Sequence, residues 1–379
     1  MSAPTAGPLA GVRVIELAGL GPGPFAAMLL ADLGCEVVRV DRPGPPAMGP
    51  AVMNRGKRSI VLDLRTELGV NALLDLVART DMLIEGLRPG VTERLGIGPD
   101  ECWARNPRLI YGRMTGWGQY GPRSQQAGHD IGYIGLTGAL HAIGPQDGPP
   151  APPLALVGDL GGGAMFLIAG LLAALHESKT SGLGQVVDAA IVDGAAALMA
   201  PMYGMLNQGA WVDRRESNLL DGGQPWYRAY RTSDDRWLAV GAIEPQFWAE
   251  LLDKLGIPAE EGARDDPAGW PALTERIAGI IAGKTRDEWE KVFTDSDACV
   301  APVRSMTEAA QDPHLVARQT FIEFDGAPVP APAPRFSRTR TADPAPAVPV
   351  GADTTAVLTQ WGVTNVSRLL ETKAAIQRG

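Results

Sequence analysis

The N-terminal part of the chain alternates short apolar runs with glycine and proline. Residues 12–17 are branched and apolar, as in a buried strand, and a Gly/Pro turn follows over 19–24. Helical periodicity then covers 25–33, before a second apolar run over 36–40 that ends at Asp41. This order of elements predicts a βαβ unit.

The alternation of helical and extended patterns continues through the next part of the chain. The periodicity predicts helices over 70–79, 164–176 and 194–205 and strands over 81–85, 109–115 and 186–191. Because parallel strands are joined through helices, this pattern predicts an α/β fold with a parallel sheet covered on both faces.

A change in the pattern at Trp226 indicates a second, smaller domain. A hairpin is expected over 227–231 and 237–241, joined by a polar turn. Amphipathic helices are predicted over 245–255, 271–281 and 286–293. The last of these helices follows Thr285 and carries Glu288, which is the spacing of a capping box. These elements predict a small α+β domain.

The domain boundaries are placed between these groups of elements. We expect a large domain at 1–206, a linker at 207–225, a small domain at 226–303 and a return segment at 304–379. Within the return segment, the proline-rich run over 328–349 predicts an extended strap, and a helix is expected near 354–361.

Composition and charge narrow the classes of function. The 379 residues are 45% hydrophobic and 20% charged, which is typical of a folded protein. A net charge of -9 argues against nucleic-acid binding. Basic residues nevertheless gather between Arg39 and Arg65, and such a patch suits a small phosphorylated ligand. A solvated charged face is the equal alternative.

The cysteines and the apolar stretches of the chain indicate the cellular compartment in which the protein is expected. Cys35, Cys102 and Cys299 are widely separated and odd in number, so we expect buried thiols in a reducing compartment. No signal peptide is evident, and the longest apolar stretch, 164–175, is short for a membrane span. These features predict a cytoplasmic protein with no membrane partner and no metal site.

The first glycine loop allows two interpretations. Gly21, Gly23 and Ala26 fit the dinucleotide pattern G-x-G-x-x-A, with Asp41 at the expected distance downstream. Pro22 and its neighbour Pro24 lack the backbone N–H groups that a pyrophosphate needs at a helix start. A tight strand-to-helix turn is therefore favoured over a nicotinamide dehydrogenase.

One of the four histidines lies where active-site groups often occur. His129 follows the polar, glycine-containing stretch 124–128, between a predicted strand and a helix. His141, His176 and His314 have no distinctive neighbours, and we expect them to be structural or solvent-exposed. His129 is thus the candidate catalytic histidine.

Six short segments, distributed in order along nearly the whole chain, carry a resemblance to a known family. These are VIELAG at 14–19, IEGLRPG at 84–90, TGWGQ at 115–119, GHDI at 128–131, GDLGGG at 158–163 and VGAIEPQF at 240–247. They resemble the family III CoA-transferase superfamily, and within it the alpha-methylacyl-CoA racemases.

The resemblance implies a catalytic site. Transferases of this superfamily use an aspartate at the position of Asp159 as a nucleophile and lack the histidine, whereas the racemases pair the two. The resemblance therefore implies that His129 and Asp159 are the two bases of a racemase, with Glu244 against the imidazole. The role of Asp130 is open between a catalytic one and loop stabilisation. A helix N-terminus at 161–163 is an expected source of N–H donors for an enolate oxygen.

The resemblance also implies a substrate, a fold and an assembly. The coenzyme A moiety is expected to contact Arg42, Leu62, Asp63, Leu64, Arg65, Gly86, Leu87, Arg88, Arg94, Gly128, Ile131 and Tyr133, and no other cofactor is implied. The large domain would be Rossmann-like and completed by 310–379. Two subunits would interlock as a homodimer, with Glu244 reaching the site of the partner.

Several points stay open at this level. Met114, Met199, Met202 and Met205 either line a surface for the acyl chain or belong to the core. Gly132 stands where the racemases usually carry Asn, which bears on the choice of acyl group. A CoA-transferase with Asp159 as the acyl acceptor is the alternative function, and a non-catalytic acyl-CoA binder is the third.

Overall fold

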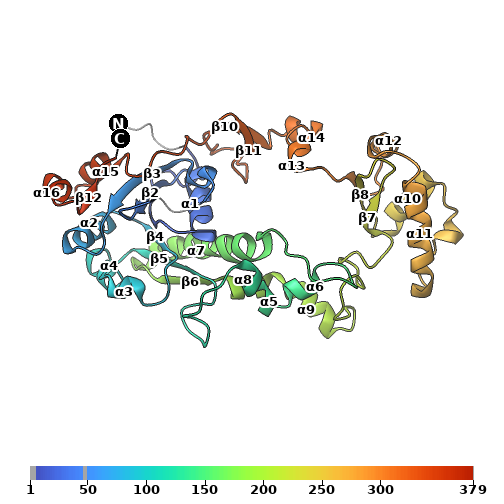
Figure 1. Ribbon diagram of the computed structural model, residues 1–379, viewed down its shortest axis with the longest axis horizontal. Helices are drawn as coiled ribbons and strands as arrows, with labels where there is room; N and C mark the ends of the chain where they lie inside the picture. The colour runs from blue at the N-terminus through green and yellow to red at the C-terminus, as the bar shows by residue number, and fades with distance from the viewer. Residues whose placement is uncertain (1–5, 46–48, 379) are drawn as a thin grey trace. The chain divides into compact units, whose positions relative to one another are not determined.

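The computed structural model describes residues 6–45 and 49–378, and their contacts form two compact units (Figure 1). Unit 1 comprises Met1–Thr137, Pro153–Met199 and Gln319–Gly379, and unit 2 comprises Gly138–Pro152 and Ala200–Arg318. The expected large domain ran continuously to residue 206, whereas the contacts group 138–152 and 200–206 with unit 2.

Unit 1 is built on a seven-stranded sheet with the strand order β12-β3-β2-β1-β4-β5-β6. Its strands are β1 (Arg13–Leu17), β2 (Glu36–Asp41), β3 (Lys57–Leu62), β4 (Met82–Glu85), β5 (Ile110–Thr115), β6 (Val186–Ala190) and β12 (Ala375–Ile376). All pairs are parallel except β12 with β3. The order 3-2-1-4-5-6 is that of a Rossmann-type fold, which confirms the predicted fold class.

Helices cover both faces of this sheet, because alternate residues of its strands are apolar on each side. On β1, Ile15 and Leu17 belong to one core cluster and Val14 to the other. The helices of unit 1 are α1 (Pro22–Asp32), α2 (Glu67–Val77), α3 (Val91–Arg94), α4 (Pro99–Arg105), α5 (Asp130–Leu136), α7 (Phe166–Ser181), α8 (Ile191–Leu198), α15 (Thr354–Gln360) and α16 (Val366–Glu371).

The sequence pattern missed β3, because polar residues interrupt it. Lys57 is 3% exposed, and its Nζ donates to Glu16 Oε2 at 2.6 Å and to the carbonyl oxygen of Pro24 at 2.9 Å. Burial lowers the pKa of Lys57. A buried lysine is tolerated only when it is paired in this way, and periodicity cannot foresee the pairing.

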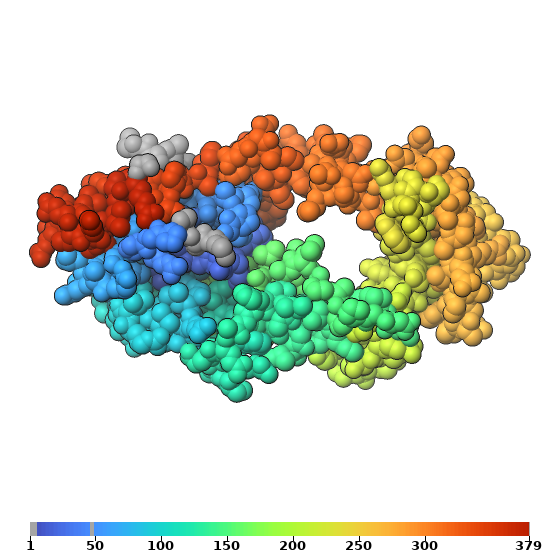
Figure 2. Space-filling model, viewed as in Figure 1, coloured from blue at the N-terminus to red at the C-terminus, as the bar shows by residue number. Residues whose placement is uncertain are grey.

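Residues 319–379 of the expected return segment belong to unit 1, where β12 pairs with the edge strand β3, whereas residues 304–318 group with unit 2. Figure 2 shows the C-terminal residues in red directly against N-terminal residues in blue. Thr354, at the start of α15, donates to Ile376 O and accepts from Val61 N. The preceding proline-rich run is largely without regular structure, after a short hairpin of β10 (Phe321–Phe324) and β11 (Ala327–Pro330).

The helix that carries Asp159 begins earlier than expected. The element η2 (Leu156–Met165) is a π-helix that continues into α7. Residues 161–163 therefore lie inside a helical run, and the expected helix N-terminus at these glycines is wrong. η2 contacts α1, α8 and the strands β5 and β6, and π-turns of this kind occur often at functional sites.

η2 and α7 together form one helical run, Leu156–Ser181, which is longer than the apolar stretch 164–175 noted in the sequence. Its 26 residues, with a mean hydropathy of 1.8, are long and apolar enough to cross a membrane by length and composition. Only 39% of its most apolar window is buried. The core helix of a soluble protein meets the same criterion, so this is weak evidence for a membrane span.

The predicted helix over 194–205 is divided in the structure. α8 ends at Leu198, and α9 (Ala200–Asn207) begins the part of the chain that belongs to unit 2. Pro201 lacks the N–H that a continuous helix would need, and it disfavours helical dihedrals in the residue before it. The single-helix prediction was wrong for this reason.

Unit 2 contains a three-stranded antiparallel sheet with helices packed on it. Its strands are β7 (Tyr227–Arg231), β8 (Trp237–Gly241) and β9 (Val300–Pro302). Its main helices are α10 (Pro245–Leu255), α11 (Trp270–Ile281) and α12 (Arg286–Val292). The hairpin, the three helices and the capping box of Thr285 with Glu288 are confirmed. Cys299 is exposed, so the expectation of a buried thiol was wrong there.

A backbone crossing between η2 and α8 gives a test of this packing. A β-carbon on Gly194 would lie 1.8 Å from the carbonyl oxygen of Gly162. We expect Gly194→Ala to lower the free energy of unfolding by at least about 1–3 kcal/mol, because both backbones must move apart. Gly132→Ala is the control, since a β-carbon there meets its nearest atom at 4.0 Å. Equal melting temperatures of the two variants would contradict the close crossing.

Candidate active site

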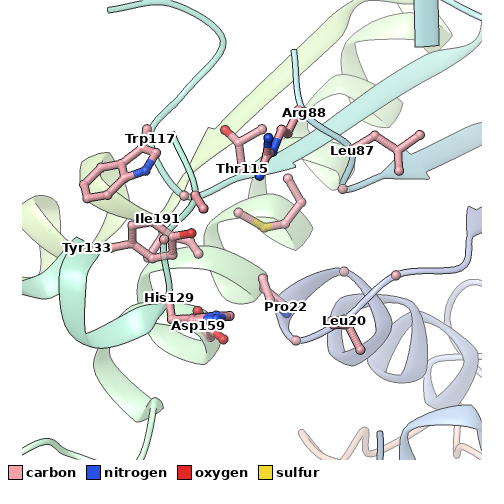
Figure 3. Close-up of a pocket in the computed structure, with 18 of the residues that line it drawn as sticks. Leu20, Pro22, Leu87, Arg88, Thr115, Trp117, His129, Tyr133, Asp159 and Ile191 are labelled. Atoms are coloured by element: carbon pink, nitrogen blue, oxygen red, sulfur yellow. The ribbon is translucent and has the colours of Figure 1, made fainter. Parts of the chain in front are cut away.

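A cavity of about 390 Å³ lies in unit 1 at the C-terminal ends of β1, β4, β5 and β6 (Figure 3). Its walls come from 17–24 after β1, 84–89 after β4 and 114–117 after β5, with Ile191 after β6. The chain turns in opposite directions from β1 and β4, and ligands of open α/β sheets bind at such a reversal. The cavity also contains His129 and Asp159.

The half-buried Asp159 is held from two sides. Its backbone N–H donates to Asp130 Oδ1 at 2.8 Å, which fixes η2 against the start of α5. A β-carbon on Gly21 would lie 3.0 Å from Asp159 Oδ2, and Gly21 has a φ of +65°. The first turn of α1 therefore approaches the carboxylate closely, and only glycine suits that position.

The environment of Asp159 brings its pKa close to neutrality. Burial, and then the negative charge of Asp130, raise this pKa, His129 opposes both effects, and the resulting pKa is about 6. A carboxyl group with such a pKa is present in both protonation states near pH 7. It can therefore either donate or accept a proton, as general acid–base catalysis requires.

His129 lies at the N-terminal boundary of α5 with its side chain uncommitted. Its carbonyl oxygen accepts from Gly132 N at 2.8 Å, and its φ of -137° is extended. The imidazole does not cap the helix, and it has no hydrogen bond among the residues described. The exposed ring is therefore available to a ligand beside Asp159 (Figure 3).

An aromatic pair forms one wall of the cavity. The rings of Trp117 and Tyr133 meet edge to face, with centroids 4.7 Å apart. β-carbons on Gly116 and Gly128 would lie 2.0 and 2.6 Å from the Tyr133 ring, so these glycines make room for it. Burial, and then the charge of Asp159, raise the pKa of Tyr133. The wall is thus a rigid, neutral surface beside the two candidate bases.

The residues expected to contact coenzyme A divide into two groups. Those that line the cavity are Gly86, Leu87, Arg88, Gly128 and Tyr133. Those outside its lining are Arg42, Leu62, Asp63, Leu64, Arg65, Arg94 and Ile131. Many of the second group follow β2 and β3, which end at the same edge of the sheet as β1 and β4.

Some members of the second group have other contacts. The side chain of Leu62 is fully buried in the core of unit 1. Arg65 donates to both carboxylate oxygens of Asp63, at 2.8 and 2.9 Å, and these bonds lower the pKa of Asp63. Arg42 and Arg94 are exposed.

Glu244 belongs to unit 2, outside the cavity residues of unit 1. It precedes α10 as its N-cap, but its side chain does not cap the helix. The residue is exposed, and its side chain has no hydrogen bond or ion pair among the described residues. Its carboxylate is therefore available to another group.

Gly21 and Asp41, which fit the dinucleotide-binding pattern in the sequence, make other contacts in the structure. Gly21 approaches Asp159, as described above. Asp41 Oδ2 accepts from Arg39 Nε and from Ser59 Oγ, both at 2.8 Å, so its carboxylate is engaged inside the sheet. Asp41 is 3% exposed and does not line this cavity.

Several cavity residues were not singled out from the sequence as binding residues. They are Leu20, Pro22, Thr115, Trp117, Ser124, Gln126 and Ile191. The polar stretch 124–128 before His129 could have indicated Ser124 and Gln126, and the Gly/Pro turn over 19–24 could have indicated Leu20 and Pro22. Met114 lines the cavity, whereas Met202 and Met205 belong to α9 of unit 2. His141, His176 and His314 are exposed, as expected.

The raised pKa of Asp159 gives a prediction about stability. Its value of about 6 exceeds the ordinary value of 3.8, so the folded protein binds this proton more tightly than the unfolded chain. This tighter proton binding stabilises the folded protein fully below about pH 4, and the stabilisation is lost as the pH rises through about 6. We therefore expect Asp159→Asn to melt at a higher temperature than wild type near pH 7.5.

Thermal melts recorded from pH 4 to pH 8 would check this expectation. The difference in melting temperature between Asp159→Asn and wild type should shrink as the pH falls toward 4. Asp147→Asn, in an exposed turn, serves as the control. A melting difference that is constant over this range of pH would contradict the raised pKa.

Comparison with known proteins places the chain in a family. The family model described as CoA-transferase family III matches residues 9–354. Alpha-methylacyl-CoA racemase of Mus musculus is 45% identical over 357 residues, covering 93% of each chain. The Homo sapiens protein of that name is 44% identical over 86% of each chain. A CAIB/BAIF family protein from Brucella suis has a similar structure, with a TM-score of 0.79 and 26% identity over 94% of this chain and 100% of its own.

Proposed function

This chain belongs to CoA-transferase family III, and from that membership we propose that it is an isomerase of the alpha-methylacyl-CoA racemase type. It interconverts the (R) and (S) forms of a 2-methylacyl-CoA thioester by 1,1-proton transfer. The similarity to two racemases supports racemase or CoA-transferase activity. The choice between the two rests on the site.

The presence of His129 beside Asp159 in one cavity is the observation that carries the proposal. Inversion requires removal of a proton from one face of the α-carbon and delivery of a proton to the other face. The C–H electron pair moves into the enolate, and the thioester oxygen takes the negative charge. One base would tend to return the same proton, so two bases are needed.

The two bases exchange roles with the direction of the reaction. Neutral His129 takes the proton from one epimer, while protonated Asp159 delivers a proton to the opposite face. In the reverse direction, ionised Asp159 takes the proton and imidazolium delivers it. The pKa of about 6 at Asp159 supports both roles near neutral pH. Asp130 acts through Asp159, by accepting its N–H and raising its pKa.

The enolate oxygen needs donors that are already in position. α5 begins at Asp130, and the first N–H groups of a helix have no acceptor within the helix. The backbone at Asp130 and Ile131, next to His129, is therefore the proposed source of these donors.

Coenzyme A is placed along the C-terminal edge of the sheet. The pantetheine arm occupies the cavity between Gly86–Arg88 and Gly128–Tyr133, and Arg42, Arg94 and the 62–65 segment hold the phosphates and adenosine. Arginine suits phosphate oxygens because its guanidinium donates in pairs and stays charged. The enzyme needs no cofactor beyond this moiety of its substrate.

We also propose an interlocked homodimer in which Glu244 of one subunit reaches His129 of the other. We propose that exposed apolar side chains on the run from η2 into α7 form one face of the assembly: Leu156, Met165 and Phe166 are 58%, 50% and 40% exposed. A face of this kind on a soluble protein marks an interface. The same face accounts for the apolar helix without a membrane. A cytoplasmic location and a role in fatty acid metabolism complete the proposal.

The dimer gives a test on α7. Phe166→Glu places a charge on the apolar face, and we expect it to yield monomers with at least about 100-fold lower racemisation, because Glu244 is then lost from the site. Light scattering coupled to gel filtration measures the mass. Thr180→Lys, at an exposed position of the same helix, should remain dimeric and active. A fully active monomer would refute the composite site.

The alternative function is a CoA-transferase in which Asp159 is the acyl-accepting nucleophile. The name of the family favours this alternative. Attack by the carboxylate on the thioester would expel CoA thiolate and leave an acyl anhydride on Asp159. Trapping of that anhydride with a CoA donor and an acceptor acid would support the transferase.

Exchange of the α-hydrogen in heavy water, without an acceptor acid, tests the racemase directly. We expect wild type to incorporate deuterium, and His129→Ala and Asp159→Asn each to lose about 10² to 10⁴ in rate while still binding acyl-CoA. Mass spectrometry and chiral analysis measure the two outcomes.

His176→Ala is the matched control for these variants, since this exposed histidine lies in unit 1 outside the cavity. Near-normal racemisation in either variant would contradict the assignment of His129 and Asp159 as the two bases. Binding of acyl-CoA by wild type without exchange or anhydride would leave a non-catalytic binder.

A further inference from the structure

Arg113 precedes Met114, which lines the cavity, and it is the centre of a polar network in unit 1. It is on β5 and is 8% exposed. Its Nη1 donates to Gln119 Oε1 at 2.7 Å, and its Nη2 donates to Glu93 Oε1. Its Nε lies 3.9 Å from Glu85 Oε1. One guanidinium thus contacts side chains from three segments.

Each of the three segments lies at the proposed coenzyme A site. Glu85 Oε2 accepts from the backbone N–H of Leu87 at 2.6 Å, which fixes the turn that leads to Arg88. Glu93 is in α3, next to Arg94. Gln119 ends the stretch after β5 that contributes Thr115, Gly116 and Trp117 to the cavity wall.

We propose that Arg113 is a positioning residue, which holds two stretches in the geometry that accepts the CoA thioester: 86–94, which follows Glu85 and contains Glu93, and 115–119, which contains Gln119. This inference rests on the proposed function, since it assigns the segments to binding of the same substrate. Arg113 does not line the cavity, so it acts through the segments that it joins. Arginine suits this task because its planar fork can donate in several directions at once.

The network is poorly suited to a purely stabilising role. Arg113 Nε and Gln119 Nε2 are buried without a hydrogen-bond partner among the described residues. Glu85 is 3% exposed, and burial raises its pKa to about 7. Arg113 and Glu85 are buried, whereas the side chain of Glu93 is 44% exposed. A partly buried charged cluster with unmet donors usually adds little stability, and an apolar core would cost less. Its arrangement is accounted for by the placement of the two segments.

Two variants of Arg113 test the proposal in the full-length protein. Arg113→Met removes all three contacts, and Arg113→Lys keeps the charge but loses the fork. We expect Arg113→Met to bind coenzyme A about tenfold more weakly by calorimetry and to raise KM for the acyl-CoA substrate by a similar factor, with kcat changed by less than about threefold. Arg113→Lys should fall between Arg113→Met and wild type.

Amide hydrogen exchange supplies a readout that does not depend on activity. Amides in 86–94 and 115–119 should exchange faster in Arg113→Met, while those of β1 and β2 keep their protection. Arg105→Met is the control, because it removes an exposed ion pair of the same unit, Arg105 with Asp75 at 3.2 Å. That variant should leave CoA binding and both segments unchanged.

Two results would overturn the role of Arg113. One is unchanged CoA affinity and unchanged amide protection in Arg113→Met. The other is an even loss of protection over the whole sheet, which would mean a general structural role. Wild type that neither binds CoA nor exchanges the α-hydrogen would refute the proposed function, and the amide measurement would still decide whether Arg113 holds the two segments.

Discussion

The backbone of η2 crosses that of α8 so closely that neither helix can carry a β-carbon at the crossing. Gly162 and Gly194 meet there, and Gly163 lies against Pro22 and Met114 on the side of the sheet. This contact fixes how closely η2 approaches the C-terminal ends of the strands. Because η2 carries Asp159, the position of the candidate base depends on the absence of a side chain at Gly162, three residues along the same element, and at Gly194 of α8. Gly21 completes the arrangement by letting the first turn of α1 approach the carboxylate.

Electrostatics at the site follow from this geometry. Asp159 is removed from water on one side by η2 and on the other by α1, and its backbone is held by a second carboxylate, Asp130. Both effects favour the protonated form, and the neighbouring His129 limits the shift. The resulting pKa of about 6 suits a group that must donate in one direction and accept in the other. A transferase would need the ionised carboxylate as a nucleophile, whereas a racemase needs both forms.

The family is defined by features that both activities share, and the distinction lies in few residues. The sheet order and the cavity at the strand reversal serve any reaction on a CoA thioester. The imidazole of His129 is uncommitted to the fold, since it neither caps α5 nor bonds to a described neighbour. A residue that the fold does not use is free for chemistry. Glu244 has the same character in unit 2, and this supports its proposed place in a site shared by two subunits.

The amino-acid sequence by itself determined the elements whose causes are local. The hairpin of β7 and β8, the capping box at Thr285 and the βαβ opening all follow from periodicity, turn residues and caps within a few positions. The sequence also singled out His129 by the polar, glycine-containing stretch before it, and the resemblance to a known family singled out Asp159. Only the tertiary structure decided what depends on contacts between distant residues: the buried pairing of Lys57 with Glu16 that allows β3, the early start of η2, and the contacts of Arg113 with Glu85 and Glu93. A lysine or an arginine in a strand looks like a surface residue until the carboxylates that pair with it, tens of positions away, are brought beside it.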